Sequence, residues 1–312
     1  MLTGILAISG VTGFIGRHLA GSLLSAGHRL LVMVRADSDR SRIPHAPGRV
    51  LVVDVADLGR ADVREQLARC DAWINAATAY GRGDPEDTER VRAANIDYPC
   101  RILDAVIEAG CARVLHFDSF FAREDLEHDY LPTYTATKKE FVRRARLRVA
   151  GTGTSFFNLR LEHVYGPLDD RKKFVPWLLT QLLQNQARIP LTAGVQERDF
   201  VFVDDVVSAT QAVLERAPDA PGCVTTIALG TGTMTSIRRF ATLAKEVAAS
   251  SSELDFGVVQ PTGRGIEASC ADTTFLRSLG WKVGISLAEG ISRTLADIRA
   301  ESADDPAVSV SR

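Results

Sequence analysis

The stretch Ile8–His28, ISGVTGFIGRHLAGSLLSAGH, determines the fold of this chain. Gly10, Gly13 and Gly16 stand between an apolar run and an amphipathic helical pattern that ends before Gly27. Glycines at a strand-to-helix turn let the backbone approach a pyrophosphate, and the helix N-terminus supplies N–H donors. The alternative is a tight turn that binds no ligand. The order of strand, glycines and helix favours a dinucleotide site.

Short apolar runs alternate with helical patterns along the first half of the chain. After GILAISG at 4–10 the runs are RLLVMVR (29–35), RVLVVDV (49–55), AWINAAT (72–78), RVLHFDS (113–119) and TSFFNLR (154–160). This alternation predicts an α/β fold, a Rossmann-type doubly wound parallel sheet, with a smaller C-terminal α/β region for substrate. We expect the Rossmann domain to span 1–165 and to receive about 200–235. The substrate region is expected at 166–199 and 236–300, and the polar residues 301–312 predict a disordered tail.

Composition narrows the class of protein. The 312 residues are 46% hydrophobic with a net charge of −2, which argues against nucleic-acid and membrane-surface partners. No run approaches the roughly 20 apolar residues of a membrane span. The N-terminus lacks a basic segment before the glycine motif, which predicts a first strand rather than a signal peptide. The five scattered cysteines predict reduced thiols in a cytoplasm and no metal site.

Tyr134 and Lys138 are candidates for acid/base chemistry because they lie one helical turn apart. Pro132 and Thr133 predict the helix start, with Thr133 as its N-cap. A free tyrosine has a pKa near ~10, and a neighbouring lysine cation favours the phenolate. The short pattern also occurs by chance in unrelated helices. Its position favours function, because Ser119 ends an apolar strand fifteen residues earlier.

The spacing GxxGxxG and the sequence TGFIG resemble the extended short-chain dehydrogenase/reductases, the NAD-dependent epimerase/dehydratase family, which mostly act on nucleotide sugars. The resemblance implies that Ser119, Tyr134 and Lys138 are catalytic and that Asn95 supports Lys138. In place of the family's SSxxVYG, Asp118 precedes the serine, and we expect it to cap local N–H groups. The residues expected to bind the dinucleotide are Gly10, Thr12, Gly13, Phe14, Ile15, Gly16, Arg35, Asp54, Val55, Ala76, Ala77, Thr78, Asn95, Tyr134, Lys138 and His163.

The second half of the chain resembles the family's substrate segments. LRLEHVYGPLDD is similar to LRxxNVYGP, with His163 in place of the asparagine. A lone histidine can instead serve packing. Together with DDRKKFVPWL, it looks most like bacterial nucleotide-diphosphate 4-keto-6-deoxysugar reductases, the group of the CDP-abequose and CDP-paratose synthases. The resemblance implies a diphosphate held by two arginines, although either one alone is more often a surface ion pair. The expected substrate residues are Ser119, His163, Lys173, Phe174, Arg198, Arg264 and Glu267.

Arg35 decides between the reactions that this family performs. It ends the second apolar run, nineteen residues after Gly16, where an acid selects NAD and a basic residue accommodates the 2′-phosphate of NADP. We therefore favour NADP(H), with NAD(H) as the second choice. In the family, 4-epimerases retain NAD and show an acid there, and 4,6-dehydratases carry an Asp–Glu pair where Phe120 and Phe121 stand. A non-catalytic NADP sensor usually lacks the Tyr or the Lys.

The resulting prediction is an NADPH-dependent reductase of the 4-keto group of a nucleotide-diphospho-4-keto-6-deoxyhexose. The partner is a nucleotide-diphosphate sugar, with no nucleic acid and no membrane. The resemblance also implies a homodimer through the helices at about 95–109 and 134–148. The nucleotide (CDP, dTDP, UDP or GDP) and the stereochemistry at C4 stay open. A 4-epimerase is the alternative, and a sensor is third.

Overall fold

Seven parallel strands form one sheet in the computed structural model, which describes residues 4–81, 85–261 and 263–304. The strand order is β11-β6-β5-β4-β1-β2-β3, and every neighbouring pair is parallel. Order and direction are those of a Rossmann fold, whose ligands bind where β1 and β4 diverge. The predicted fold class is confirmed. The strands are β1 (Ile5–Ser9), β2 (Arg29–Val34), β3 (Val50–Asp54), β4 (Cys70–Asn75), β5 (Arg113–Ser119), β6 (Ser155–Leu161) and β11 (Val224–Leu229).

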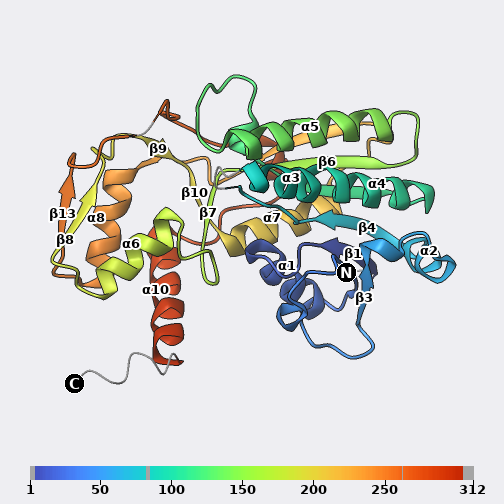
Figure 1. Cartoon of the computed structure of the whole chain (residues 1–312), viewed down its shortest axis with the longest axis horizontal. Coiled ribbons are helices and arrows are strands. Elements are labelled where there is room, and N and C mark those ends of the chain that lie inside the picture. The colour runs from blue at the N-terminus through green and yellow to red at the C-terminus, as the bar shows by residue number, and fades with distance from the viewer. Residues whose placement is uncertain (1–3, 82–84, 262, 305–312) are drawn as a thin grey trace. The chain divides into compact units, whose positions relative to one another are not determined.

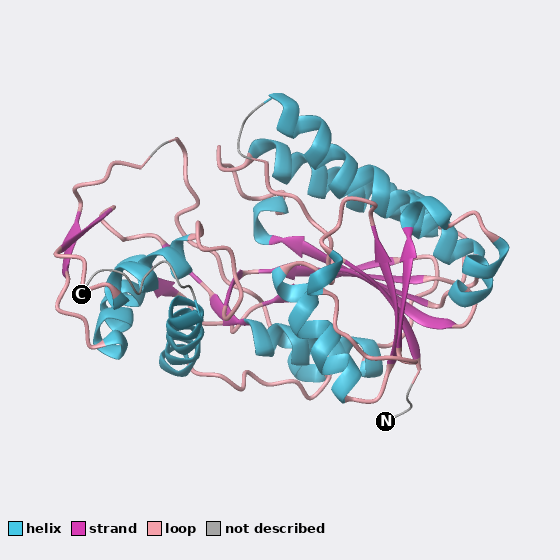
Figure 2. Cartoon of the chain, turned by 60° about the horizontal axis from the view of Figure 1, so that its bottom comes forward, coloured by secondary structure: helices cyan, strands magenta, loops and turns pink. Residues whose placement is uncertain are grey.

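Helices cover both faces of this sheet, as Figures 1 and 2 show. α3, α4 and α5 lie on one side, and α1 and α7 on the other. Both faces are therefore dry, which explains why the central strands are almost continuously apolar. The helices and turns are α1 (Phe14–Ser25), η1 (Arg40–Arg42), η2 (Val55–Asp57), α2 (Ala61–Leu67), α3 (Pro85–Arg92), the π-helical turn η3 (Ala93–Asp97), α4 (Tyr98–Glu108), η4 (Phe120–Ala122), α5 (Pro132–Val149), α7 (Val203–Arg216) and α9 (Thr274–Ser278).

The pairing of β5 with β6 sets which side chains face α5. His116 lies opposite Asn158 and Asp118 opposite Arg160. The His116 ring contacts Phe141 of α5, with ring centroids 4.6 Å apart. Because side chains two apart on a strand share a face, Asp118 and Arg160 also point toward α5. Charged groups thus lie beneath the helix that carries Tyr134 and Lys138.

The described chain divides into two compact units. The first comprises residues 4–161, 207–229 and 274–281, and the second 162–206, 230–273 and 282–304 except residue 262. The second unit pairs β7 (His163–Tyr165) with β10 (Phe200–Phe202), β8 (Arg188–Leu191) with β13 (Glu253–Phe256), and β9 (Glu197–Arg198) with β12 (Thr235–Ser236). Its helices are α6 (Phe174–Leu183), α8 (Ile237–Ala248) and α10 (Leu287–Asp304). Residues 305–312 of the predicted tail lie outside the described residues.

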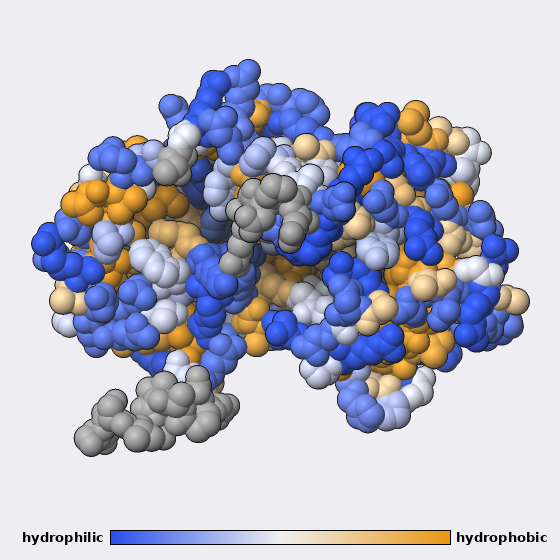
Figure 3. All heavy atoms as spheres, in the orientation of Figure 1, coloured by the Kyte–Doolittle hydropathy of each residue, from blue (hydrophilic) through white to orange (hydrophobic). Residues whose placement is uncertain are grey.

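Each unit has its own packing centre. In the first, Trp73, Phe141 and Phe156 are fully buried. In the second, Phe200 stacks on Phe240 with centroids 4.2 Å apart. On the face that Figure 3 shows, hydrophilic residues are interspersed with smaller groups of hydrophobic ones. None of the described helices is long and apolar enough to cross a membrane.

Candidate active site

The three motif glycines have different reasons to be glycine. Gly10 has φ +82°, and a Cβ there would lie 2.3 Å from the Ala77 nitrogen. A Cβ on Gly16 would lie 2.0 Å from the Gly10 oxygen. Gly13 is exposed and has φ −88°, which any residue adopts, and its Cβ would meet only the Gly10 oxygen, at 3.3 Å. Packing thus requires glycine at positions 10 and 16, whereas Gly13 leaves the start of α1 uncovered.

The N-terminus of α1 suits an anion. Gly13 is its N-cap residue, and no side chain caps this helix. The first turn of a helix presents N–H groups and a partial positive charge. Thr12, Phe14 and Ile15 are half-buried around it. This geometry fits the pyrophosphate of a dinucleotide, and a tight turn alone would not call for an exposed glycine at position 13.

A buried network fixes the segment after β4. The Asn75 side chain accepts from the Ser9 hydroxyl at 2.9 Å and from the Ala77 N–H at 3.2 Å. The Ala76 N–H donates to the Ser9 oxygen at 2.9 Å. Residues 76 and 77 are thereby held against Gly10, so the backbone of this segment and that of the glycine loop form one rigid wall.

Asn95 joins this segment to α5, the helix that carries Tyr134 and Lys138. Its amide accepts from the Ala79 N–H at 2.8 Å and donates to the Ala79 oxygen at 2.9 Å. It also donates to the Thr137 hydroxyl at 3.0 Å, and it lies 3.4 Å from the Thr78 hydroxyl. Asn95 sits in the π-helical turn η3, a local geometry that often occurs at functional sites. Its hydrogen-bond partners in the structure are Ala79, Thr137 and Thr78, whereas the resemblance implies that it supports Lys138.

Arg35 follows β2, and its guanidinium lies 5.7 Å from the centre of the Tyr98 ring. It is partly exposed, and its Nε is 3.5 Å from Asp37. At the end of β3, Asp54 accepts from the Ala56 N–H at 2.8 Å and lies 3.6 Å from Arg40. The end of β2 therefore carries a cation that rests on an aromatic ring and is weakly paired. Val55, the residue after Asp54, is buried.

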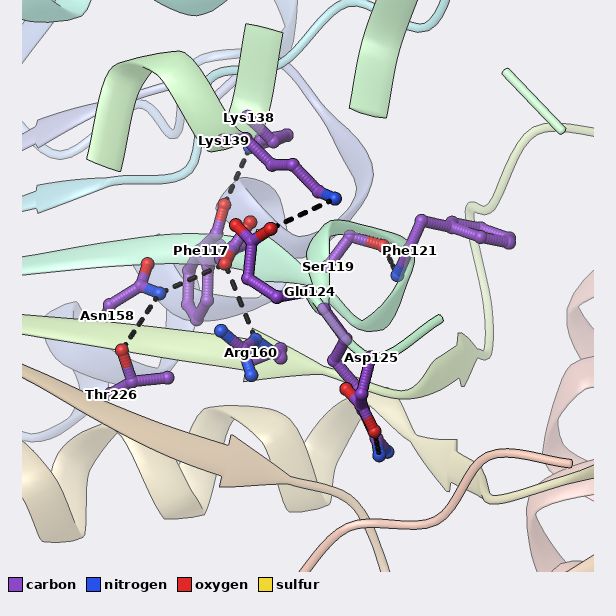
Figure 4. Close-up of polar contacts among 12 residues, drawn as sticks. Phe117, Ser119, Phe121, Glu124, Asp125, Lys138, Lys139, Asn158, Arg160 and Thr226 are labelled. Carbon is purple, nitrogen blue, oxygen red and sulfur yellow. Dashed lines mark hydrogen bonds and ion pairs between the residues drawn. The ribbon is translucent and has the colours of Figure 1, made fainter. Parts of the chain in front are cut away.

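The structure brings Ser119, Tyr134 and Lys138 together. All three are buried, and Lys138 donates to the Phe117 oxygen at 2.7 Å (Figure 4). The Lys138 Nζ lies 5.9 Å from the centre of the Tyr134 ring. The Ser119 hydroxyl accepts from the Phe121 N–H at 3.3 Å.

The predicted N-cap of α5 is wrong. The helix begins at Pro132, and the N-cap is Leu131 in the left-handed region at φ 48°. Proline fits the first helical position because it has no N–H to leave unpaired there. Thr133 lies inside the first turn.

Burial has the largest effect on the pKa values of Tyr134 and Lys138. It raises the pKa of the Tyr134 phenol well above its usual range, and Tyr80 adds to this, whereas Ser119 lowers it. Burial lowers the pKa of Lys138 to about 8, and Asp118 opposes that shift. The direction for Tyr134 is opposite to that expected from a neighbouring lysine cation, since desolvation outweighs it.

Asp118 does not cap local N–H groups, contrary to the prediction. Its side chain is buried, accepts from the Asn158 amide at 3.0 Å and lies 3.7 Å from the Arg160 Nε. The Asn158 amide is also 3.4 Å from the Thr226 hydroxyl of β11. A polar row therefore crosses β5, β6 and β11 beneath α5 (Figure 4). By contrast, Lys139 points to Glu124 at 3.7 Å.

Two groups of aromatic contacts, one at Tyr134 and one at Phe121, were not predicted from the sequence. The exposed Tyr80 stacks on Tyr134. Phe121 contacts His128 and Tyr130, with centroids 5.3 and 5.1 Å away. In the sequence, Phe121, His128 and Tyr130 are visible only as aromatic residues of one short segment. Which of them make contact depends on the fold.

In the second unit, two cationic side chains, those of Arg198 and Lys173, lie near His163. Burial lowers the pKa of His163 to about 3, and Arg198 and Lys173 add to this. Its ring contacts Phe200, with centroids 4.9 Å apart. Lys173 donates to the buried Asp169 at 2.7 Å. His163 is therefore neutral at ordinary pH, and the positive charge here comes from Arg198 and Lys173.

Arg198 is held by backbone oxygens. It donates to Ile266 and Glu197, both at 2.7 Å. Arg264 and Glu267 lie on an exposed segment, and Arg198 approaches the backbone of Glu267 at 3.4 Å. Phe174 starts α6 and packs near Phe240. Of the predicted substrate residues in this unit, His163, Lys173 and Arg198 lie together, and Arg264 is placed on the loop.

Asp199 is a buried residue that sequence reasoning passed over. It is fully buried and accepts from the backbone of Thr231 and Gly232 at 2.8 and 2.9 Å, and from that of Ala271 at 3.2 Å. Asp199 thereby fixes the backbone at 231–232 and at 271, in the two segments that flank β9 and its Arg198.

Known proteins share this architecture. The sequence profile of the NAD dependent epimerase/dehydratase family matches residues 6–227. The chain is 32% identical over 293 residues to CDP-abequose synthase of Salmonella typhimurium, covering 92% of this chain and 96% of the other. It is 27% identical to UDP-glucose 4-epimerase of Mycolicibacterium smegmatis, covering 95% and 98%.

Solved structures agree in fold. UDP-glucuronic acid 4-epimerase from Bacillus cereus, in complex with UDP-glucuronic acid and NAD, superposes with a TM-score of 0.81 at 20% identity, covering 95% of this chain and 99% of the other. MoeE5 in complex with UDP-glucose and NAD gives 0.79 at 24% identity, covering 96% and 100%. From its profile match and its similarity to a relative along nearly its whole length, the chain belongs to the NAD dependent epimerase/dehydratase family.

Proposed function

We propose that this protein uses NADPH to reduce the 4-keto group of a nucleotide-diphospho-4-keto-6-deoxyhexose in deoxysugar biosynthesis. The observation that carries the proposal is Arg35 at the end of β2, where an NAD enzyme of this fold has an acid. The similarity to CDP-abequose synthases at 29–32% identity supports the substrate class. A CDP-linked keto-sugar is therefore the first substrate to test.

The residues present fit a dinucleotide. Gly13 is exposed at the N-terminus of α1, and no side chain caps this helix. Arg35 follows β2, and Arg40 of η1 lies 3.6 Å from Asp54 at the end of β3, so both offer positive charge where a 2′-phosphate would be received. The buried Lys138 would hold the nicotinamide ribose. A bound NADPH supplies the hydride.

The chain's own residues supply the proton and the orientation. Ser119 orients the ketone by hydrogen bonding. Tyr134, whose raised pKa keeps it protonated, donates its O–H proton to the ketone oxygen as that oxygen becomes a hydroxyl. Lys138 stabilises the phenolate that is left, and solvent then returns the proton.

The second unit suits the nucleotide diphosphate. Arg198 is positioned by the Ile266 and Glu197 oxygens, and with Lys173 it offers two cations near neutral His163. An arginine fork matches two phosphate oxygens at once. Neutral His163 can donate one hydrogen bond to a sugar or phosphate oxygen without a change of charge.

One assay tests the proposal. Purified protein is mixed with NADPH and a CDP-4-keto-6-deoxyhexose, and the loss of NADPH and the sugar product are followed. We expect one NADPH oxidised per 4-hydroxy product, and Tyr134→Phe to lower turnover about 10²- to 10⁴-fold. Near-normal turnover by Tyr134→Phe would overturn the assignment of the proton donor. Interconversion of C4 epimers without net oxidation of NADPH would instead establish the 4-epimerase.

A further inference from the structure

A buried carboxylate stands one residue before Ser119 and is not used by the mechanism above. Asp118 is 3% exposed, on a strand that is buried from its second residue onward. One of its oxygens accepts from Asn158 at 3.0 Å and lies 3.7 Å from Arg160. Its other oxygen has no hydrogen-bond partner among the described residues. Burying a carboxylate that is only partly paired is costly, so its retention calls for a reason.

The geometry directs this carboxylate at the catalytic pair. Asp118 shares the face of β5 that His116 turns toward Phe141 of α5. The Lys138 ammonium donates to the oxygen of Phe117, the residue adjacent to Asp118. The carboxylate and the ammonium are both buried and close enough to interact, in surroundings with little water to screen them.

We propose that Asp118 is a positioning residue that holds the Tyr134–Lys138 pair in its proton-loaded form, with Lys138 charged and Tyr134 neutral. The inference rests on the proposed reduction, because reduction needs Tyr134 as a proton donor. An enzyme that begins by oxidising a hydroxyl needs the phenolate instead. The negative charge of Asp118 favours the first state over the second.

The other polar groups near Tyr134 and Lys138 do not favour the proton on both residues. His116 is neutral, because burial and Lys138 hold its pKa well below its usual range. Arg160 carries a positive charge that opposes Asp118, and Tyr80 stacks on the outer side of Tyr134. Of these groups, Asp118 alone favours the proton on both members: it raises the pKa of Lys138 and that of Tyr134.

The test compares two substitutions of opposite electrostatic sign in one network. Asp118→Asn keeps the shape and removes the negative charge, and Arg160→Gln removes the positive charge. The full chain is labelled with ¹⁵N at its six lysine side chains, and each is titrated by NMR, with Lys138→Met assigning the signal. We expect Asp118→Asn to lower the pKa of Lys138 by about one unit or more and Arg160→Gln to raise it.

A network that merely supports the fold would not move Lys138 in opposite directions. An unchanged Lys138 titration in Asp118→Asn, or shifts of the same sign in both variants, overturns the inference. If Asp118→Asn does not fold, Arg160→Gln decides, since an unchanged or lowered pKa there also overturns it. The measurement needs no turnover. A shift found in a protein that fails the keto-sugar assay would refute the proposed reaction but not the effect of Asp118 on the protonation of Lys138.

Discussion

The exposed Tyr80 lies face to face with the buried Tyr134, with ring centroids 4.8 Å apart and ring planes 21° apart. This stack gives the first prediction. The Tyr80 hydroxyl raises the pKa of Tyr134, and Tyr80→Phe removes this hydroxyl while keeping the ring. We therefore expect a lower Tyr134 pKa in Tyr80→Phe, measured by NMR titration of ¹³C-labelled tyrosine. Tyr130→Phe, an exposed tyrosine that contacts Phe121, is the control that leaves Tyr134 unchanged. An unaltered titration in Tyr80→Phe would refute the coupling.

The second prediction concerns the cofactor. Arg35→Asp is expected to raise KM for NADPH about 10- to 100-fold, because a charge-assisted contact to a phosphate is lost and a like charge is introduced. KM for NADH should stay the same or fall. Arg60→Ala, an exposed arginine paired with Asp62 at the start of α2, serves as the matched control. A wild-type preference for NADH would contradict the role of Arg35.

The third prediction separates the glycines by what each would meet. Gly16→Ala puts a methyl group 2.0 Å from the Gly10 oxygen, so we expect a loss of about 1–3 kcal/mol in the free energy of unfolding. Gly13→Ala should cost about 0.5 kcal/mol or less while weakening NADPH binding about tenfold or more. Denaturant unfolding and NADPH fluorescence titration measure the two effects. Equal loss of stability in both variants would mean that Gly13, too, is a packing glycine.

The fourth prediction follows from the protonation of His163. Its pKa is lowered to about 3 in the folded chain, below the value of about 6.5 of an unfolded histidine. The unfolded chain thus binds the extra proton first, and stability is lost as the pH falls from about 6.5 toward 3. His163→Asn should lose less stability over that window than the wild type. Parallel curves of unfolding free energy against pH would show that His163 is not responsible, and above pH 7 the two proteins should have equal slopes.

Much of the fold was within reach of the sequence, because its determinants are local. The alternation of apolar runs with helical patterns indicates a covered parallel sheet, and Gly10 and Gly16 mark its first turn. Tyr134 and Lys138 share a helix face by spacing alone. The strand end at Ser119 then brings a third polar group to the same edge of the sheet.

The parts that escaped prediction depend on pairing between distant segments. Asp118 meets Arg160 only because β5 and β6 are in that register, and no local pattern gives the register. The signal was present but ambiguous: one acid and one base, each near the end of an apolar run. Thr133 was chosen as N-cap by residue type, whereas Pro132 sets the helix start through its fixed φ.

The π-helical turn at Ala93–Asp97 has a consequence for insertions and deletions in this chain. A π turn corresponds to an α-helix with one additional residue, so removing a single residue such as Ala94 would restore regular helix. Because the wide turn absorbs the additional residue, the helical segments on either side would keep their orientation, whereas the residues within the turn would change theirs. Asn95 could then no longer reach both Ala79 and Thr137. The deletion would make the helix more regular, but it would disconnect the segment after β4 from α5. Selection for stability alone would therefore remove the π-helical turn.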